Sequence, residues 1–255
     1  MSPETNSADS AGVPWEGRRF EPNPAAGDDG SADPALLAAL TNFHDGSGDQ
    51  IAIIEALRTA RVLIPLIAEN GEEGVAPSGL AVDKTQELSI VTVAAPDVRT
   101  VLPIFTSVET MRTWDPLARP IPVAGVRAAL SAASDQTDLL VVDPTAATEY
   151  VVRRPAVWAL TQDEAWVPSP QSPEVFQALQ ESVGTELAVI DVTVAAGDPQ
   201  ARLRGPELVV TLHLVEGLDQ TQLDAVLQRL AQRWAADNRI AVLVDSLSVK
   251  LQRAA

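Results

Sequence analysis

The stretch that decides the fold is Leu102-Pro-Ile-Phe-Thr-Ser107, which is completed further along the chain by Leu139-Leu-Val-Val-Asp-Pro144. Each stretch is a short apolar run that ends at turn residues, as buried strands do. Ser107 has a side chain suited to a helix N-cap and predicts a helix over residues 108–114. A second helical pattern over residues 123–133 leads into the later strand. This succession of strands and helices predicts a mixed α/β sheet.

The residues before this unit continue the same alternation. Asp33-Pro34 predicts an N-cap followed by the first helical residue, and apolar residues from Ile53 to Ala60 recur at helical spacing. Residues 62–68 predict a strand, in which Pro65 favours an edge position or a bulge because proline cannot donate to the sheet ladder. Further strands are predicted over residues 88–94 and 150–152. Together these elements predict an α/β (mixed α+β) domain over residues 34–166.

Three prolines within residues 167–173 mark a change in composition and predict a proline-rich linker. A second small sheet-plus-helix domain is predicted over residues 174–255. Its expected elements are a helix over 174–182, strands over 187–194 and 208–215, a helix after Asp219 and a last strand over 240–244. In the helix after Asp219, an apolar stripe runs from Leu223 to Trp234, with Leu227 in its middle.

Residues 1–33 are rich in Pro, Gly, Ser and acidic residues and have no apolar period. Such a segment cannot bury enough surface to offset the entropy of ordering, so an acidic disordered tail is predicted. Trp15 and Phe20 flank an arginine pair within it. They are interpreted either as stray aromatics of an idle tail or as a short docking motif for a partner.

The charge balance excludes two classes of partner. Lys and Arg number 18 against 35 Asp and Glu, which gives a net charge of −17. Phosphate backbones and anionic lipid surfaces are bound mainly through basic side chains, so neither nucleic acid nor a membrane is an expected partner. The apolar runs are also shorter than the ~20 residues that a spanning helix needs.

The chain contains no cysteine, which excludes disulfides, thiolate metal sites and cysteine nucleophiles. The first residues have neither a basic nor an apolar segment of the kind that begins a secretory signal, so a cytoplasmic location is expected. Only His44 and His213 are available as imidazole ligands or bases, and they fall in different predicted domains. No nucleophile-elbow or phosphate-loop motif occurs. No catalytic residue, metal or cofactor is therefore predicted.

Basic residues are scarce enough to stand out where they occur. Arg119 and the pair Arg153-Arg154 are interpreted either as anion anchors of a binding cleft or as partners of surface carboxylates. The carboxylates Asp115, Asp143 and Glu149 are nominal acid/base candidates, and each is equally explained as a cap, a turn residue or a surface charge.

The order of several short motifs resembles the N-terminal domain of the SseB family. They are Phe105-Thr106-Ser107, Trp114, Arg119-Pro120, the helix rich in small residues, and Val141-Val-Asp-Pro144. The part after the prolines is similar to that family's C-terminal domain, so the resemblance covers about residues 49–255. It implies an accessory or regulatory bacterial protein and brings no catalytic residues with it.

Two functions are expected from different classes. The first is a non-catalytic cytoplasmic protein that binds another protein, whose basic surface would complement this acidic one. The alternative is a sensor of an anion or an amino-acid-like metabolite, or an enzyme that uses a carboxylate. Its candidate cleft would be lined by Phe105, Thr106, Ser107, Trp114 and Arg119, because the turn meets a helix N-terminus. The oligomeric state is not predicted.

Overall fold

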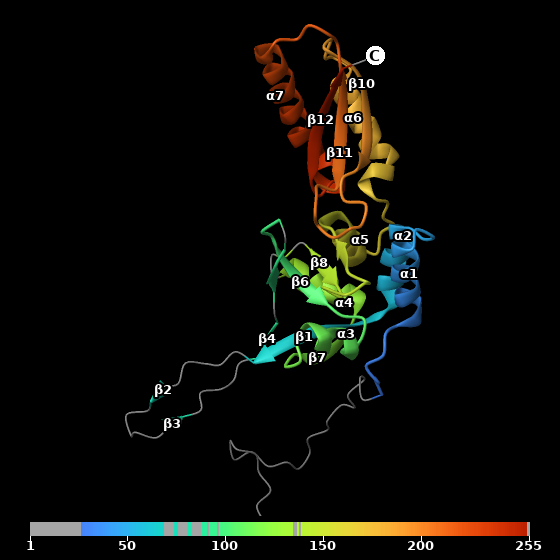
Figure 1. Ribbon diagram of the computed structural model, residues 1–255, viewed down its shortest axis with the longest axis vertical. Coiled ribbons are helices and arrows are strands. Elements are labelled where there is room, and N and C mark those ends of the chain that lie inside the picture. Colours follow the sequence, from blue (N-terminus) through green and yellow to red (C-terminus); the bar gives the residue numbers. More distant parts are fainter. Residues whose placement is uncertain are drawn as a thin grey trace, which may run out of the picture.

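The protein is described from a computed structural model, in which the described residues are 27–68, 74–75, 81–82, 88–90, 92–95, 97–134, 137 and 139–253. The predicted docking residues Trp15 and Phe20 lie outside them. The molecule is elongated, with an N-terminal half that ends near residue 166 and a C-terminal half beyond it (Figure 1). Each half combines a sheet with helices, which confirms the predicted mixed α/β fold class.

The N-terminal half alternates helices with short strands. In chain order its elements are α1 (Pro34–His44), α2 (Gln50–Thr59), β1 (Arg61–Ala68), β2 (Gly74–Val75), β3 (Ala81–Val82), β4 (Leu88–Ile90), β5 (Val93–Ala94), β6 (Thr100–Ile104), α3 (Val108–Trp114), β7 (Arg119–Ala124), α4 (Gly125–Ser134), β8 (Leu140–Val142), β9 (Tyr150–Val152) and α5 (Arg154–Gln162). Strands β6 and β8, predicted from the two opening stretches, are parallel neighbours in the sheet β5-β6-β8-β9.

Strand β1 corrects the prediction made from Pro65. It lies in the middle of the sheet β4-β1-β7, not at its edge. Leu63 exchanges both backbone hydrogen bonds with Phe105, so the backbone of Leu63, and of Pro65 two residues on, faces away from β7. Because the backbone of Pro65 does not face β7, its lack of an N–H costs the β1–β7 pairing no hydrogen bond. The same two bonds join the sheet of β1 to the end of β6.

Helices α1, α2, α4 and α5 bury one face of these strands in a common apolar core. Helix α4 approaches closely because its buried residues are Gly125, Ala128, Ala129 and Ala132. A Cβ on Gly125 would lie 2.1 Å from the backbone oxygen of Leu57, so only glycine fits there. The predicted helix over residues 123–133 begins two residues late, because Val123 and Ala124 belong to strand β7.

The last residues of the predicted disordered tail are packed against the body. Arg61 forms an ion pair with Asp28, 2.8 Å from Nε to Oδ2, and Val108 N–H donates to Gly30 O at 2.9 Å. Residues 27–33 therefore correct the end of the predicted tail. These contacts are polar and come from residues without apolar periodicity, which is why the sequence pattern does not reveal them.

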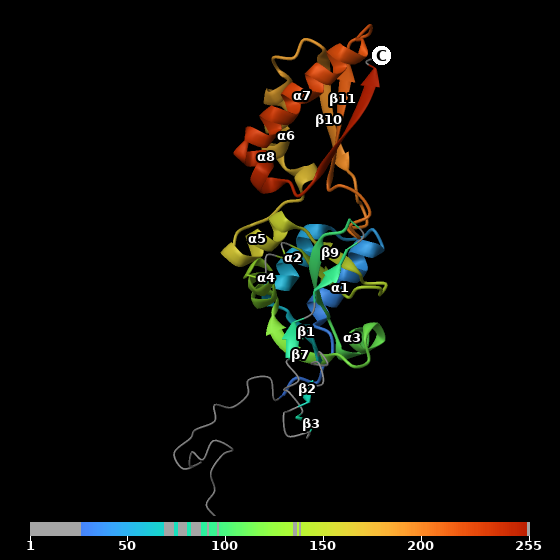
Figure 2. The same cartoon turned by 90° about the vertical axis from the view of Figure 1, so that its left-hand side faces the viewer.

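The C-terminal half begins in the proline-rich segment, where a 3₁₀ turn, η1 (Ser169–Gln171), is packed with Ser169 only 1% exposed. The elements that follow are α6 (Pro173–Val183), β10 (Val189–Ala196), β11 (Leu208–Leu214), α7 (Gln220–Ala236), α8 (Asn238–Leu243) and β12 (Leu247–Arg253). The order in the sheet is β10-β11-β12, with β12 parallel to β11. All three helices lie on one side of this sheet (Figure 2). Whether the two halves fold independently stays a prediction.

The predicted last strand over residues 240–244 is wrong. Asp237 accepts the N–H of Arg239 and caps helix α8, in which Ile240 is buried against the sheet. A short apolar run of this kind does not distinguish a strand from a buried helical turn. The last strand is β12, which had no predicted counterpart.

Candidate functional site

The turn at Phe105-Thr106-Ser107 is built into the core. Phe105 is fully buried, and its ring lies 5.3 Å from that of the half-buried Trp114, measured between centroids. Ser107 caps helix α3 through a capping box with Thr110. The predicted cap is confirmed, and the Ser107 side chain is engaged in capping the helix.

Asp143 is the buried partner of this turn. Its carboxylate accepts the N–H of Thr106 at 2.8 Å, the Thr106 hydroxyl at 2.7 Å and the Thr148 hydroxyl at 2.8 Å. The Thr110 hydroxyl is a fourth donor, at 3.0 Å. A buried carboxylate supplied with four donors is satisfied in place, and this one joins the ends of β6 and β8. Asp143 is thus a structural residue.

The five residues of the predicted cleft do not converge. Arg119 is exposed on the edge strand β7, and its side chain has no hydrogen bond or ion pair within the described part of the chain. Phe105 and Thr106 are buried, and Ser107 caps α3. The geometry favours an architectural role for this motif.

Arg153, at the start of helix α5, joins the two halves. Its guanidinium donates to Asp198 at 2.8 Å and to Asp245 at 2.9 Å, and both carboxylates come from the C-terminal half. Arg99 adds two hydrogen bonds to Asp245, at 2.8 and 2.9 Å. The sequence interpretation of Arg153 is corrected, since its partners are buried carboxylates and not surface ones.

Two carboxyl groups in this junction have shifted pKa values of opposite direction. Burial alone would raise the pKa of Asp245, but the hydrogen bonds and charges of Arg99 and Arg153 outweigh it and hold the pKa below its usual range. Burial raises the pKa of Glu207, and the N–H of Asp245 only partly offsets that effect. The junction therefore places Asp245, whose ionised form is favoured, beside Glu207, whose neutral form is favoured.

Arg154 closes the junction on its other side. It donates to the backbone oxygens of Ala241 at 3.0 Å and Val244 at 2.7 Å, at the end of helix α8. Its guanidinium carbon also lies 5.3 Å from the ring centroid of Trp158, within cation–π range. The arginine thus fixes one wall of the neighbouring cleft.

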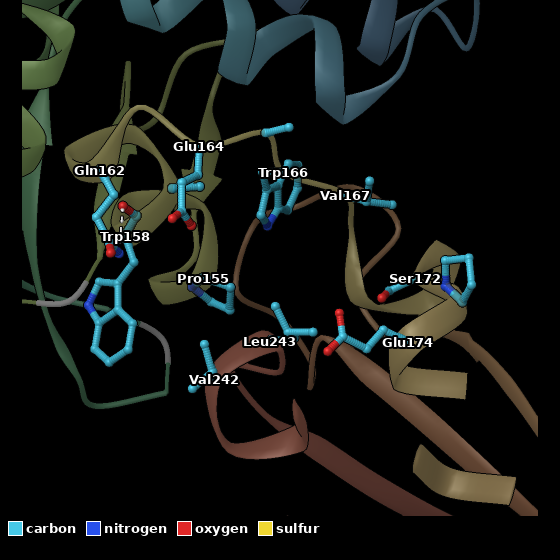
Figure 3. A pocket seen from close by; sticks show the side chains of 13 residues that line it. Pro155, Trp158, Gln162, Glu164, Trp166, Val167, Ser172, Glu174, Val242 and Leu243 are labelled. Atoms are coloured by element: carbon cyan, nitrogen blue, oxygen red, sulfur yellow. Dashed lines mark hydrogen bonds between the residues drawn. The ribbon is translucent and has the colours of Figure 1, made fainter. Parts of the chain in front are cut away.

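That cleft, of about 420 Å³, lies where α5, the proline-rich segment and α8 meet (Figure 3). Both halves of the molecule contribute to it. Its apolar lining includes Pro155, Trp158, Trp166, Val167, Val242 and Leu243. A cleft with two tryptophans and aliphatic walls offers apolar contact area together with aromatic faces.

The charged residues among the described lining of the cleft are both acidic, and the other polar ones are Gln162 and Ser172. Glu164 and Glu174 are exposed at opposite sides of it, and neither forms an ion pair with a described residue. Trp166 is 7% exposed, and its buried indole nitrogen, which Figure 3 shows on the cleft side of the ring, has no acceptor among the described residues. Carboxylates and aromatic faces attract cations, and a free N–H attracts a carbonyl oxygen. We define this set of residues as the acidic tryptophan cleft.

The described residues contain no group of three His, Asp or Glu side chains placed to hold a metal ion, and no helix among them is long and apolar enough to cross a membrane. His213 lies on the sheet face opposite the helices, where its Nε2 is 3.1 Å from the Thr193 hydroxyl. The sequence reasoning missed the acidic tryptophan cleft, although the pattern Glu-Ala-Trp before the prolines was visible.

Comparison with known proteins identifies a family for the N-terminal half. Residues 35–159 match the family model described as the SseB protein N-terminal domain. The matched segment runs from α1 into α5 and includes both stretches that predicted the fold. The C-terminal half lies outside it, so its resemblance to the family's second domain stays a prediction. No curated protein and no solved structure matches the chain.

Proposed function

We propose that this chain, which belongs to the SseB family through residues 35–159, is a non-catalytic accessory or regulatory protein of the cytoplasm that binds another protein. The binding site in this proposal is the acidic tryptophan cleft. Its occupant is a segment of the partner that presents Lys or Arg side chains on an extended backbone.

The observation that carries the proposal is the combination of donors and charges in one cleft. Glu164 and Glu174 are carboxylates without an ion-pair partner, so a basic side chain would gain both without displacing another cation. The N–H of Trp166 is buried and has no partner among the described residues, so a small turn of the indole towards the cleft would let a backbone carbonyl of the same segment satisfy it. A basic peptide supplies both the positive charge and the carbonyl acceptor, whereas a simple metal ion supplies only the charge and an anion supplies only an acceptor.

The charge of the whole chain supports the same class of partner. At a net charge of −17, the chain attracts a basic surface over distances longer than a contact, which raises the rate of association at low salt. The proposal that the protein is not an enzyme rests on its lack of a catalytic motif and on the packing of the Phe105-Thr106-Ser107 turn.

Affinity capture from the native cytosol tests the proposal. The bait is the full chain, compared with a Glu164→Gln/Glu174→Gln variant. A matched control, Glu109→Gln/Glu216→Gln, removes the same number of charges from exposed positions outside the cleft. We expect one protein to be captured by the wild type and the control but lost by the cleft variant. Equal capture by all three baits would remove the cleft from the proposal.

A further inference from the structure

A second pocket, of about 260 Å³, lies against the sheet β5-β6-β8-β9. It is on the face opposite the one that helices α1, α2, α4 and α5 cover. Its floor is formed by Val101 of β6, Val141 of β8 and Val151 of β9, three neighbouring strands whose alternate residues face the helical core. Trp114 and Pro144 complete the apolar wall. This pocket shares no lining residue with the acidic tryptophan cleft.

The C-terminal half provides the remaining side of the pocket. The loop between β10 and β11 descends towards β9 (Figure 2), where Val151 N–H donates to Ala201 O at 2.7 Å. Leu203 of this loop is buried against the valines. Arg202, between them, lines the pocket and donates through Nη2 to Ala147 O at 3.2 Å.

Arg202 is the charged group that identifies a ligand. Arg202 is half-buried, its Nη1 forms no hydrogen bond with a described residue, and no described carboxylate lies within ion-pair distance of its guanidinium. A guanidinium with a free donor beside apolar walls matches a carboxylate that carries a hydrocarbon chain. Asp198, the nearest acid in the loop, is already occupied by Arg153 and by Leu203 N–H.

The backbone around the pocket is held in an uncommon conformation. Six described residues other than glycine have positive φ, and four of them lie at this pocket or next to it: Asp143, Thr145, Ala201 and Leu203. Ala201 and Leu203, at 49° and 56°, flank Arg202 directly. In proteins generally, a non-glycine residue with positive φ is kept only where its surroundings hold it, and such residues are concentrated at ligand-binding positions.

We propose that this pocket binds a small apolar carboxylate, with the hydrocarbon chain against the valines and Trp114 and the carboxylate on Arg202. The pocket's size suits a small molecule and not a peptide. Among the described residues that line it, Glu149 is the one acid, and its carboxylate accepts Thr145 N–H at 2.7 Å. Its charge opposes an anion, so it limits the affinity. This inference goes beyond the proposed protein-binding function and uses different residues.

Calorimetric titration of the full chain with 4-methylpentanoate, and with the neutral 4-methylpentanamide, tests the inference. We expect the acid to bind and the amide to bind at least about tenfold more weakly, because only the acid forms the charged hydrogen bond. Arg202→Gln should weaken binding of the acid by about the same factor. Arg204→Gln, an exposed arginine of the same loop, is the matched control and should change nothing.

Glu149→Gln gives a result of the opposite sign. Its amide oxygen can still accept Thr145 N–H, but the opposing charge is removed, so the acid should bind more tightly. Melting curves of all variants establish that they are folded. The inference is overturned if the acid and the amide bind equally, if Arg202→Gln binds the acid as well as the wild type, or if neither the wild type nor Glu149→Gln binds it.

Discussion

Trp166 combines deep burial with an unsatisfied donor. A buried N–H without an acceptor costs about 1–3 kcal/mol relative to one that is paired. Trp166→Phe removes the donor and keeps an aromatic ring. We therefore expect the free energy of unfolding to fall by less than the ~3 kcal/mol typical of large truncations in a core, since part of the lost packing is offset. Urea unfolding measures this change.

The same variant should bind the basic partner more weakly, because the carbonyl that pairs with the indole N–H loses its donor. Trp234→Phe is the control, since the indole N–H of Trp234 is already paired with the Ser182 hydroxyl at 2.7 Å, outside the cleft. Its unfolding free energy should fall further and its partner affinity should stay unchanged. A Trp166→Phe variant with full partner affinity would contradict the assigned role of this N–H.

Glu207 makes stability depend on pH. Because burial raises its pKa in the folded state above the ordinary value of 4.5, the folded protein binds more protons than the unfolded chain just above that pH. The contribution of Glu207 to stability therefore falls as pH rises through this window. Glu207→Gln removes the group whose ionisation destabilises the fold. The unfolding free energy of the variant relative to the wild type should therefore rise as pH increases from about 5 to about 7.

Urea unfolding of both proteins at the two pH values gives the comparison. The general repulsion of an acidic protein is common to both and largely cancels in the difference. Glu216→Gln, at an exposed position, should give a difference that does not grow with pH. If the Glu207→Gln difference were equally flat, the carboxyl would titrate normally and the burial argument would be wrong.

The hydrogen bonds of a side chain could be predicted from the sequence where its partner lies within a few residues along the chain. The caps by Ser107 and Asp219 are confirmed, since each binds a backbone N–H three residues away. Arg153 could not be interpreted in this way, because Asp198 and Asp245 are 45 and 92 residues distant in the chain. Asp143 was assigned to a turn, and its role as acceptor for Thr106 depends on the pairing of β6 with β8.

At the scale of elements, helix α7 was the most predictable. Its apolar stripe is confirmed, but the centre lies at Val226, Leu230 and Trp234, while Leu227 is only partly buried. Leu230→Asp should therefore unfold the C-terminal half, because it places an unpaired charge in the core. Leu227→Asp should lower the melting temperature by a smaller amount. Equal melting temperatures for the two variants would contradict this assignment of the helix face.

Strand β7 and helix α8 are two of the elements that the sequence did not predict. Strand β7 contains Pro120 and Pro122, which are tolerated because β7 is an edge strand and those backbone positions face away from β1. Helix α8 has the composition of a strand, and its capping by Asp237 decides its conformation. The preference of β7 is therefore overridden by its place in the sheet, and that of α8 by its cap.

At the scale of the molecule, the acidic tryptophan cleft exists because the two halves are held together. The ion pairs of Arg153 and the hydrogen bonds of Arg154 bring α8 against α5, so that Trp158 and Val242 line one cavity. The sequence predicted both halves but not their junction, since buried ion pairs over such separations leave no local pattern. Charge and composition alone had indicated a basic partner.

The most direct test of the account is the dissociation constant of the captured partner for three proteins, measured at low and at high salt. They are the wild type, Glu164→Gln/Glu174→Gln and the control Glu109→Gln/Glu216→Gln. The account predicts that the cleft variant binds about tenfold more weakly at low salt, a loss of ~1.4 kcal/mol, and depends less on salt, while the control stays close to the wild type. Equal losses in the cleft variant and the control would show that only net charge matters, and would contradict the cleft as the binding site.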